Sequence, residues 1–547
     1  MLSLLRKSAW IWYVASGLLS IGFLLIIFAD IGDTGFASIY FNSDMLYDPV
    51  IFRDIFLDGT GFKGWHLNAA PNFFPDMFFY FIFMALSGNF ITANFLFSIF
   101  QYLVILALVL WLFRQVNREN GLQLAATFNF MMFLFLLVPV FTDRFHLAFQ
   151  LISISYHMGS FIMYLLSLNL LLLYLRKKSG PVLVLLFFSA LLGVINDRLF
   201  ISQFVFSLLP LVLLLLNHVH RKILLRPLSV IIAATILGLG FFRLLKVSGY
   251  IYIIGTGFKM FNFENLAVSW NTFVDYILRI FRNYHAERGI LIIFIFALVL
   301  ALVYLFHHRK LILKPEPQEQ HFYQKYLIIV IASYLPVTLL IPVINGAFVA
   351  ESIIRFNVMA FFMGIMLLPL VLGTWKMTEN NTARLLRYLL PVTTFTFLVL
   401  FGVKIATVEF SDGMRHYFDY YPEKVRVIDE LKEEHGLKYG VGDYWYAKYT
   451  TMFSRKEVRI YTIFSHALRP FYHSTNENWY HDGGKGRYRN PVFNFTVRKI
   501  NADSEKLKST FQERLDTIYI NNEDNYIVMK LPEFKIDRST REFVLLD

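Results

Sequence analysis

Eleven apolar runs limit how this chain of 547 residues can fold. Hydrophobic residues make up 56% of the sequence, whereas soluble domains carry roughly 45–50%, so much of this surface has to be buried in lipid. A helix needs about 20 apolar residues to cross a bilayer. We therefore predict a polytopic α-helical membrane protein with about eleven transmembrane helices. The predicted spans are residues 8–28, 91–113, 121–141, 156–175, 181–196, 199–217, 227–243, 289–306, 326–343, 355–373 and 386–406.

Basic residues predict which way these spans run. Arg6 and Lys7 precede the first run and no small-residue cleavage site follows it, so 8–28 is interpreted as an uncleaved span with a cytoplasmic N-terminus. Every strongly basic short loop then falls on the cytoplasmic side. The net charge of +12 thus reflects topology, and nucleic acid is excluded as a partner because no continuous basic patch is apparent. The cytoplasmic loops hold Arg114, Arg118, Arg176, Lys177, Lys178, Arg221, Lys222, Arg226, Arg309, Lys310, Lys314, Lys376, Arg384 and Arg387.

The apolar stretch 73–86 is interpreted differently from the spans. Counting it as a span would place every later basic loop on the outside, against the charge rule. The stretch is also short, and Pro71 and Pro75 lie at its start. We therefore predict a juxtamembrane helix that lies in the membrane interface with its Phe and Tyr side chains among the headgroups.

On this map, three substantial segments reach the outer face, namely 29–90, 244–288 and everything after about residue 407. The last segment has a mixed, charged composition. We predict a membrane domain over 1–406 and a small extracytoplasmic α/β domain over 407–547. The elements expected in the second domain are a helix over Tyr421–His435 and strands at Tyr439–Val441, Val458–Tyr461 and Ile518–Met529, the last with a turn at Asn521–Asn525.

The first outer loop is acidic, with seven Asp and no Glu between residues 30 and 76. Asp44 precedes a predicted helix and lies near the membrane boundary, where a carboxylate can act as general base towards an acceptor hydroxyl or amine. The alternative is a capping or solvated Asp. Asp76 either stabilises a helix start or contacts substrate. Trp65 and His66 lie in the same loop and are further candidates for substrate binding.

Ionisable residues also gather where later spans reach the outer face. Such residues at the edge of the hydrocarbon are costly, are usually paired and often mark a substrate path. Interfacial snorkelling is the alternative. The histidines and aspartates could also bind a divalent cation, although no compact ligand spacing occurs. The residues are Asp143, Arg144, His146, His157, Asp197 and Arg198.

Basic residues on the outer face call for an explanation. Arg355 begins the tenth span, and a guanidinium forms bidentate hydrogen bonds to phosphate. An ion pair with Glu351, one helical turn earlier, is the alternative. The basic residues of loop 244–288 could hold a phosphate headgroup or rest on anionic lipid. They are Lys246, Lys259, Arg279, Arg282, His285 and Arg288.

Several short motifs follow one another in an order that is familiar from a known family. They are Asn42-Ser43-Asp44, the helix from Pro71 to Leu86, Thr142-Asp143, Arg355-Phe356 and the tract from Gly442 to Thr450. In this order and topology the chain resembles the C superfamily of glycosyltransferases (GT-C), and most of all the bacterial relatives of protein mannosyltransferases and aminoarabinose transferases. It departs from the mannosyltransferase pattern at Met45, where an acidic residue is common.

The resemblance implies an enzyme of the bacterial inner membrane that transfers a sugar from a polyprenyl-phosphate donor on the outer face, with inversion. The acceptor would be a glycan, a lipid or a protein. Asp44 would be the general base, Asp143 a second acid, and Arg355 the residue that holds the donor phosphate. A divalent cation stays open as a cofactor.

Two other classes of function remain as alternatives. A transporter or flippase of a lipid-linked sugar would need charges deep in the spans or inverted repeats with broken helices. A non-catalytic envelope scaffold could bind polysaccharide through the aromatic, basic stretch Arg469–Arg489.

The absence of cysteine excludes disulfides, thiol catalysis and cysteine metal sites.

Overall fold

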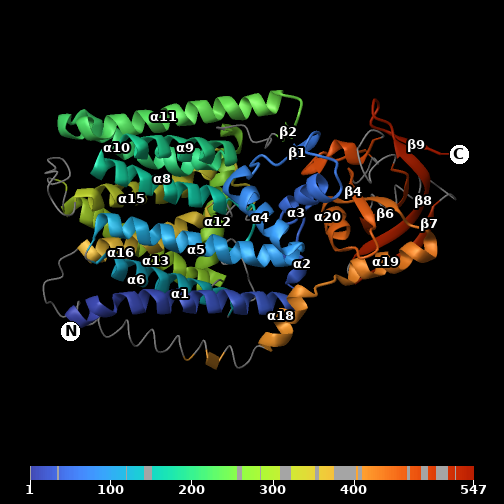
Figure 1. Cartoon of the computed structure of the whole chain (residues 1–547), viewed down its shortest axis with the longest axis horizontal. Coiled ribbons are helices and arrows are strands. Elements are labelled where there is room, and N and C mark those ends of the chain that lie inside the picture. Colours follow the sequence, from blue (N-terminus) through green and yellow to red (C-terminus); the bar gives the residue numbers. More distant parts are fainter. Residues whose placement is uncertain are drawn as a thin grey trace.

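A bundle of long helices forms one half of the protein, and a mixed α/β region lies beyond one end of it (Figure 1). The structure is a computed structural model. It describes residues 2–33, 36–118, 120–140, 151–254, 262–283, 285–307, 309, 322–350, 357–374, 399, 402–403, 409–464, 469–481, 491–500, 515–523 and 525–546. The bundle contains α1 (Leu2–Asp33), α5 (Phe90–Val116), α6 (Gly121–Val140), α8 (Met158–Lys177), α9 (Gly180–Asn196), α10 (Leu209–Leu213), α11 (His218–Val247), α13 (His285–His307), α15 (Phe322–Ile344) and α16 (Val358–Thr374).

The membrane character predicted from the sequence agrees with these helices. Each of the first ten predicted spans contains a described helix, and five helices are long and apolar enough to cross a bilayer. The number of eleven spans stays a prediction, since several other apolar helices, such as Gly180–Asn196 and Met359–Val371, are shorter and most of 386–406 lies outside the described residues. The five helices are Trp10–Gly32, Phe90–Val116, Met158–Lys177, His220–Val247 and Tyr323–Ile344.

Contacts between described segments mark the two ends of the bundle. At one end, Arg176 donates to the carbonyl oxygen of Gln115 at 2.9 Å and its guanidinium lies over the ring of Tyr323. At the other end, the side chain of Asn72 donates to the carbonyl oxygen of Ser155 at 3.3 Å. The basic ends of α5 and α8 thus lie together, while the topology of the whole chain and the side of the membrane on which each end lies stay predictions.

The stretch interpreted as juxtamembrane forms a π-helical turn (Phe73–Met77) that continues into α4 (Phe78–Ser87). It begins beside Asn196 at the end of α9, where the amide of Phe74 donates to the Asn196 side chain. It ends at Gly88, whose φ of +65° allows the turn into α5. There, Met84 and Gly88 border the same cavity as Met452 of the C-terminal region. Both ends of the stretch thus lie at one end of the bundle, and the stretch does not cross it.

The C-terminal region is built on a mixed sheet. Strand β3 lies between β4 and β6 and is parallel to both, and β8 pairs antiparallel with β6, β7 and β9. The predicted helix and strands of this region are confirmed, but α18, α20, β6 and β9 were not predicted. The elements are α18 (Phe410–Phe418), α19 (Glu423–His435), β3 (Tyr439–Gly442), α20 (Tyr444–Phe453), β4 (Arg459–Thr462), β6 (Phe493–Lys499), β7 (Asp516–Asn521), β8 (Tyr526–Ile536) and β9 (Phe543–Leu545).

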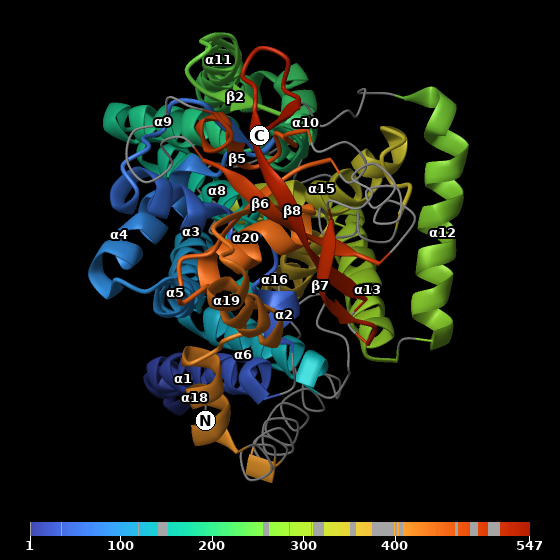
Figure 2. The same ribbon diagram turned by 90° about the vertical axis from the view of Figure 1, so that its right-hand side faces the viewer.

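The first outer loop joins this region to the bundle. It forms α2 (Ala37–Tyr40), α3 (Tyr47–Phe52), a π-helical turn (Arg53–Leu57) and β1 (Trp65–Leu67). Strand β1 pairs with β2 (Tyr252–Ile253) and with β5 (Thr475–Asn476), so three distant segments share one small sheet. The loop therefore lies between the helix bundle and α20, as Figure 1 shows. Figure 2 gives the same elements seen from the C-terminal side.

Helix α18 crosses the end of α1 at close range. A Cβ atom on Gly413 would lie 2.4 Å from the carbonyl oxygen of Ala29, and one on Gly32 would lie 2.1 Å from the carbonyl oxygen of Gly413. Only glycine leaves room for two helix backbones to approach so closely. This crossing fixes where the chain enters the C-terminal region.

Candidate functional site

The candidate site forms where Asp44 of the first loop meets the start of α20. Asn42 accepts hydrogen bonds from the amides of Asp44 at 2.9 Å and Met45 at 3.1 Å, a local turn that sets the direction of the Asp44 side chain. The Tyr444 hydroxyl donates to Asp44 Oδ1 at 2.6 Å, and the Ser43 hydroxyl donates to the carbonyl oxygen of Tyr444 at 2.6 Å. The half-buried Asp44 carboxylate is thereby fixed against α20.

Lys448 lies one turn further along α20 and is buried beside this pair. Its ammonium donates to the carbonyl oxygen of Ser43 at 3.2 Å and lies 3.4 Å from the Tyr444 hydroxyl. It also lies over the rings of Tyr444 and Tyr47. Burial lowers the Lys448 pKa to about 7, although the negative charge of Asp44 acts to raise it. A buried amine with such a pKa can exchange protons near neutral pH.

Asp48 supplies a second, fully buried carboxylate. The Ser155 hydroxyl, just before α8, donates to Asp48 Oδ2 at 2.5 Å. Asp48 Oδ1 has no hydrogen-bond partner among the described residues. Burial raises the Asp48 pKa well above its usual range, while Ser155 and Lys448 oppose the rise. The site therefore combines a buried acid and a buried base in a small volume.

Asp76 and the start of α8 extend this group of ionisable residues. The buried Asp76 carboxylate lies against Gly159 in the first turn of α8, where unpaired amides favour negative charge. Burial raises the Asp76 pKa to about 7, and the Asn196 amide opposes the rise. Nearby, His157 Nδ1 lies 2.6 Å from Asp197 Oδ2. The predicted residues Asp44, Asp76, His157 and Asp197 are thus gathered at one end of the bundle.

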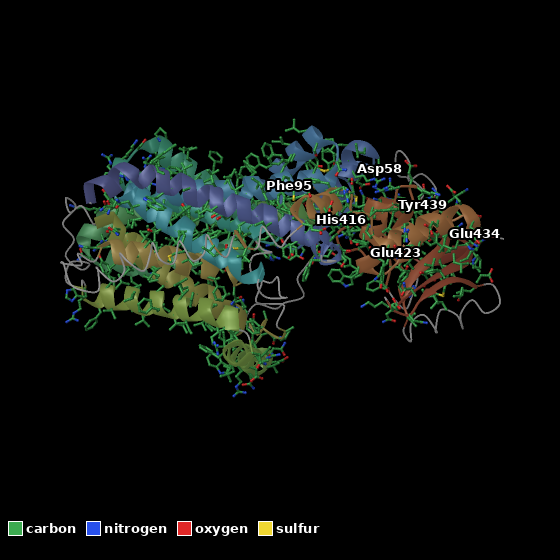
Figure 3. The ribbon with its side chains drawn as sticks, turned by 90° about the horizontal axis from the view of Figure 1, so that it is seen from below. Asp58, Phe95, His416, Glu423, Glu434 and Tyr439 are labelled. Atoms are coloured by element: carbon green, nitrogen blue, oxygen red, sulfur yellow. The ribbon has the colours of Figure 1, made fainter. Side chains whose placement is uncertain are left out.

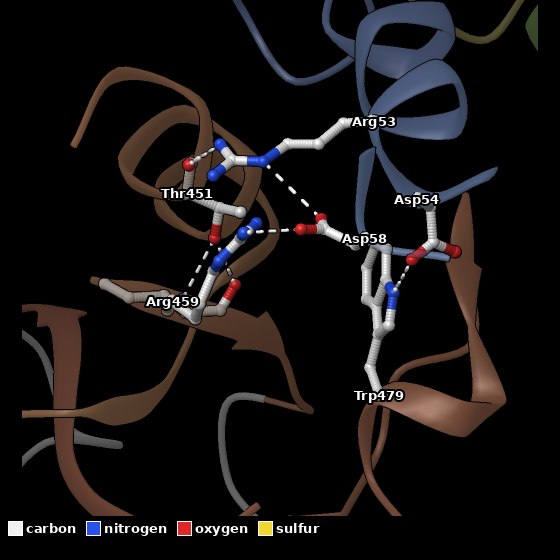
Figure 4. A network of polar contacts seen from close by, with 7 residues as sticks. Arg53, Asp54, Asp58, Thr451, Arg459 and Trp479 are labelled. Carbon is white, nitrogen blue, oxygen red and sulfur yellow. Dashed lines mark hydrogen bonds and ion pairs between the residues drawn. The ribbon is translucent and has the colours of Figure 1, made fainter. Parts of the chain in front are cut away.

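Two other acidic residues of the loop hold the C-terminal region in place. Asp58 Oδ1 pairs with Arg459 at 3.1 Å, and Asp58 Oδ2 lies 3.5 Å from Arg53 (Figure 4). Asp54 accepts a hydrogen bond from the Trp479 indole at 3.0 Å. Figure 3 shows Asp58 at the junction between the loop and the C-terminal region. These carboxylates are structural, so the acidity of the loop divides between docking and the candidate site.

Trp65 and His66, predicted to bind substrate, instead occupy packing positions in β1. Trp65 is buried with its ring edge-on to Trp479, the centroids 5.3 Å apart. His66 is stacked between Tyr252 at 4.4 Å and Tyr472 at 4.5 Å. Both residues therefore join the loop to its neighbours and do not line the candidate site.

Several of the predicted basic residues lie away from Asp44. Arg198 is exposed, and its guanidinium lies 4.9 Å from the ring of Phe242 on α11. Arg282 and Arg288 lie where α12 (Leu266–Asn283) turns into α13, and His285 begins α13. Figure 2 shows α12 at the edge of the molecule, away from α20 and α3. Whether these residues bind substrate stays a prediction, because sequence spacing does not report lateral position in the bundle.

Four predicted site residues lie outside the described residues, namely Asp143, Arg144, His146 and Arg355, and so does Lys259 of loop 244–288. Their meeting with Asp44 therefore stays a prediction. Within the described ranges, no three His, Cys, Asp or Glu side chains are grouped in a way that would hold a metal ion. The divalent cation also stays a prediction, because two of its candidate ligands belong to these four residues.

Lys448, Tyr444 and Asp48 were not predicted as site residues. The signal for Lys448 was present, since it is the one charged residue in the helix Tyr444–Phe453. Asp48 follows Asp44 by four residues, a spacing that suggests a shared face. Neither signal reveals that the two segments meet.

An open cavity of about 390 Å³ adjoins this group. Asn42, which positions Asp44, forms part of its wall, and so does Trp445, whose ring lies 5.1 Å from that of Tyr444. Trp445 is 53% exposed. Aromatic walls with a few polar groups are typical of ligand sites. The other lining residues are Ser38, Tyr420, Pro422, Glu423, Lys424, Tyr446, Tyr449 and Lys499.

Comparison with known proteins gives no relative. No family model matches the chain, and no curated protein matches it in sequence. The class that the fold defines is a helical membrane protein with a C-terminal α/β region, and its activity is a matter for proposal.

Proposed function

We propose that the protein is an integral-membrane glycosyltransferase that uses a polyprenyl-phosphate sugar as donor. The observation that carries the proposal is the half-buried Asp44 carboxylate, held at 2.6 Å by Tyr444 beside the buried Lys448 and next to an aromatic cavity. A general base needs a fixed orientation of its carboxylate, a nearby group that can take up the proton it receives, and space for the acceptor substrate. This group of residues supplies all three.

In the proposed reaction, the oxygen of an acceptor hydroxyl attacks C1 of the donor sugar. The bond between C1 and the phosphate oxygen breaks, and its electron pair leaves with the lipid phosphate. The hydroxyl proton passes to the Asp44 carboxylate. Because the oxygen attacks the face opposite the phosphate, the configuration at C1 is inverted. Since phosphate is a good leaving group, the protein has mainly to position the reactants and to receive the proton.

Tyr444 and Lys448 act through Asp44. The Tyr444 hydroxyl donates to Asp44 Oδ1 and so fixes the orientation of the carboxylate. Lys448, whose pKa burial lowers to about 7, lies 3.4 Å from that hydroxyl and can take the proton onward. Both are positioning residues in this scheme.

The cavity is assigned to the acceptor. Its aromatic wall, with the exposed Trp445, suits the apolar face of a sugar ring, and its polar groups suit hydroxyls. Asn42, whose side chain accepts from the Asp44 amide, forms part of its wall. The donor would approach from the lipid side, where the resemblance assigns Arg355 to its phosphate.

The alternatives find less support. None of the eleven predicted spans contains Asp or Glu, whereas a transporter driven by ion coupling depends on such groups. The scaffold alternative placed polysaccharide on the stretch that begins at Arg469. In its described part, Trp479 and Tyr480 are buried in the core and are not available to a glycan.

The test is to supply purified protein in lipid nanodiscs with radiolabelled hexose on undecaprenyl phosphate, together with extracted envelope glycolipid as acceptor. We expect release of undecaprenyl phosphate and transfer of the label to the acceptor. In proteoliposomes with donor on one leaflet only, movement of intact donor without release would support the flippase instead. Neither release nor movement, across donors that carry neutral and amino sugars, would contradict both.

A further inference from the structure

Helix α12 (Leu266–Asn283) has two faces of opposite character. At about 100° per residue, its apolar residues fill an arc of roughly 160°. Val268 is the one apolar side chain that falls among the polar residues of the opposite arc. The apolar arc carries Leu266, Ala267, Trp270, Phe273, Val274, Ile277, Leu278, Ile280 and Phe281. The polar arc carries Asn271, Thr272, Asp275, Arg279, Arg282 and Asn283.

One flank of the apolar arc is covered by the protein. Phe273 packs edge-on against Phe348, in the turn after α15, with ring centroids 5.3 Å apart. The amide of Phe348 donates to the Ser269 hydroxyl at 3.0 Å, and Val343 completes this small core. Helix α12 is therefore attached across the end of α15, next to the last turn of that helix.

The other flank of the arc has no cover from the described part of the chain. Trp270 is 52% exposed and Leu278 43% exposed. The apolar surface continues onto α13, where Ile292 and Phe296 are exposed as well. At the corner between the two helices, Arg288 donates to the carbonyl oxygen of Phe281 at 3.1 Å. Two adjoining helices thus both carry exposed apolar side chains, and one of them belongs to a predicted span.

The orientation of α12 differs from that of the bundle. Figure 2 looks along the bundle helices and shows α12 lengthwise, and Figure 3 shows it end-on below the bundle. It therefore runs roughly perpendicular to the spans, near the end where the C-terminal region lies. An amphipathic helix in this position has its apolar face at the level where hydrocarbon gives way to headgroups.

We propose that α12 lies in the membrane interface and that its occupant is a lipid surface with anionic headgroups. Trp270 and Leu278 enter the outer part of the hydrocarbon, and tryptophan favours this depth. Arg279 and Arg282 extend towards the lipid phosphates, where each basic residue favours anionic lipid. The helix then fixes how deep the protein sits, with the Asp44 site on the aqueous side of it. The proposal does not rest on the enzymatic function.

The chain has no native cysteine, so single labels can test the proposal in the full-length protein. Trp270→Cys places a nitroxide on the uncovered apolar face, and Asp275→Cys, roughly 140° around the helix, is the matched control on the polar face. Both variants are reconstituted in nanodiscs of phosphatidylcholine and phosphatidylglycerol at 3:1. Power saturation then compares collisions of each nitroxide with lipid-soluble oxygen and with a water-soluble nickel chelate.

We expect the residue 270 label to collide at least threefold more with oxygen than with the chelate, and the residue 275 label to show the reverse. Equal access of the chelate to both labels would overturn the proposal in favour of a solvated helix. Shielding of the residue 270 label from both reagents would overturn it in favour of a protein partner or a second copy. Arg279→Gln with Arg282→Gln should weaken the oxygen preference at residue 270 in the mixed lipid and leave it unchanged in pure phosphatidylcholine; equal effects in both lipids would overturn the anionic-lipid part.

Discussion

The Tyr444 hydroxyl donates a 2.6 Å hydrogen bond to Asp44, a residue that precedes it by 400 positions in the chain. This contact joins the first outer loop to the C-terminal region at the place where chemistry is proposed. Lys448 is buried against both residues. A short motif in the loop and a short aromatic helix thus form one site only after the whole chain has folded.

Removal of the Tyr444 hydroxyl tests this contact. Tyr444→Phe should lower turnover of the labelled donor at least tenfold and stability by only about 1–2 kcal/mol, since Asp44 is half-buried and keeps water as a partner. Tyr250 is exposed, so Tyr250→Phe is the matched control and should change neither turnover nor stability. Full activity of a folded Tyr444→Phe protein would contradict the role of Tyr444 in positioning Asp44.

Gly159 is expected to tolerate no side chain. A Cβ atom there would lie 1.8 Å from Asp76 Oδ2, so Gly159→Ala has to displace a buried carboxylate. Overpacking of this kind costs about 1–3 kcal/mol, measured as a lower midpoint of thermal unfolding. Gly240→Ala on α11 meets nothing within 4 Å and should be neutral or slightly stabilising. Equal midpoints for the two variants would contradict the described packing.

Asp76 predicts a pH dependence of stability. Its pKa is raised by burial from 3.8 to about 7, so the folded state holds a proton that the unfolded state has lost between these values. The stabilising contribution is complete below about pH 4 and is lost as the pH rises through about 7. In Asp76→Asn, the unfolding midpoint should therefore fall less between pH 5 and 7.5 than in the parent protein. The exposed Asp419→Asn should follow the parent, and parallel curves for all three proteins would refute the assignment.

The ion pair of Arg459 with Asp58 should dominate the docking of the C-terminal region. Both side chains are buried, and removal of one partner from such a pair costs about 3–5 kcal/mol. Arg459→Met should therefore expose the region to limited proteolysis. Arg426→Gln breaks an exposed pair with Glu423, which solvent screens, and should leave proteolysis unchanged. Similar proteolysis rates in the two variants would show that docking rests elsewhere.

The sequence alone predicts the parts of the fold that obey local rules. The length of the apolar runs predicts where the helices lie, and the basic loops predict which helix ends lie together. The hydrogen bond from Arg176 to the Gln115 carbonyl oxygen joins two such ends. Helix α19 follows from Pro422 at its start and Gly436 at its end, where φ is +65°. These features can be predicted because each is determined by residues that are close together in the sequence.

The candidate site was predicted only in part because its contacts are non-local. Asp44 was identified by its motif, but the same loop chemistry at Asp54 and Asp58 serves docking, and only the partners Trp479 and Arg459 reveal this. The position of Arg198 was likewise not predictable from the sequence, since its guanidinium lies over the ring of Phe242 on a distant helix. Spacing along the chain reports depth in the membrane and leaves lateral position undetermined.

The central claim is that Asp44 receives the proton of the acceptor. The most direct measurement is single-turnover release of undecaprenyl phosphate from the labelled donor by Asp44→Asn, with the exposed Asp419→Asn as matched control and thermal unfolding as a check on folding. An amide cannot act as a base, and general-base catalysis typically contributes about 10²–10⁴-fold. We predict a loss of that size for Asp44→Asn, with unchanged donor binding and full activity in Asp419→Asn. Release at the parent rate by a folded Asp44→Asn protein would contradict the account.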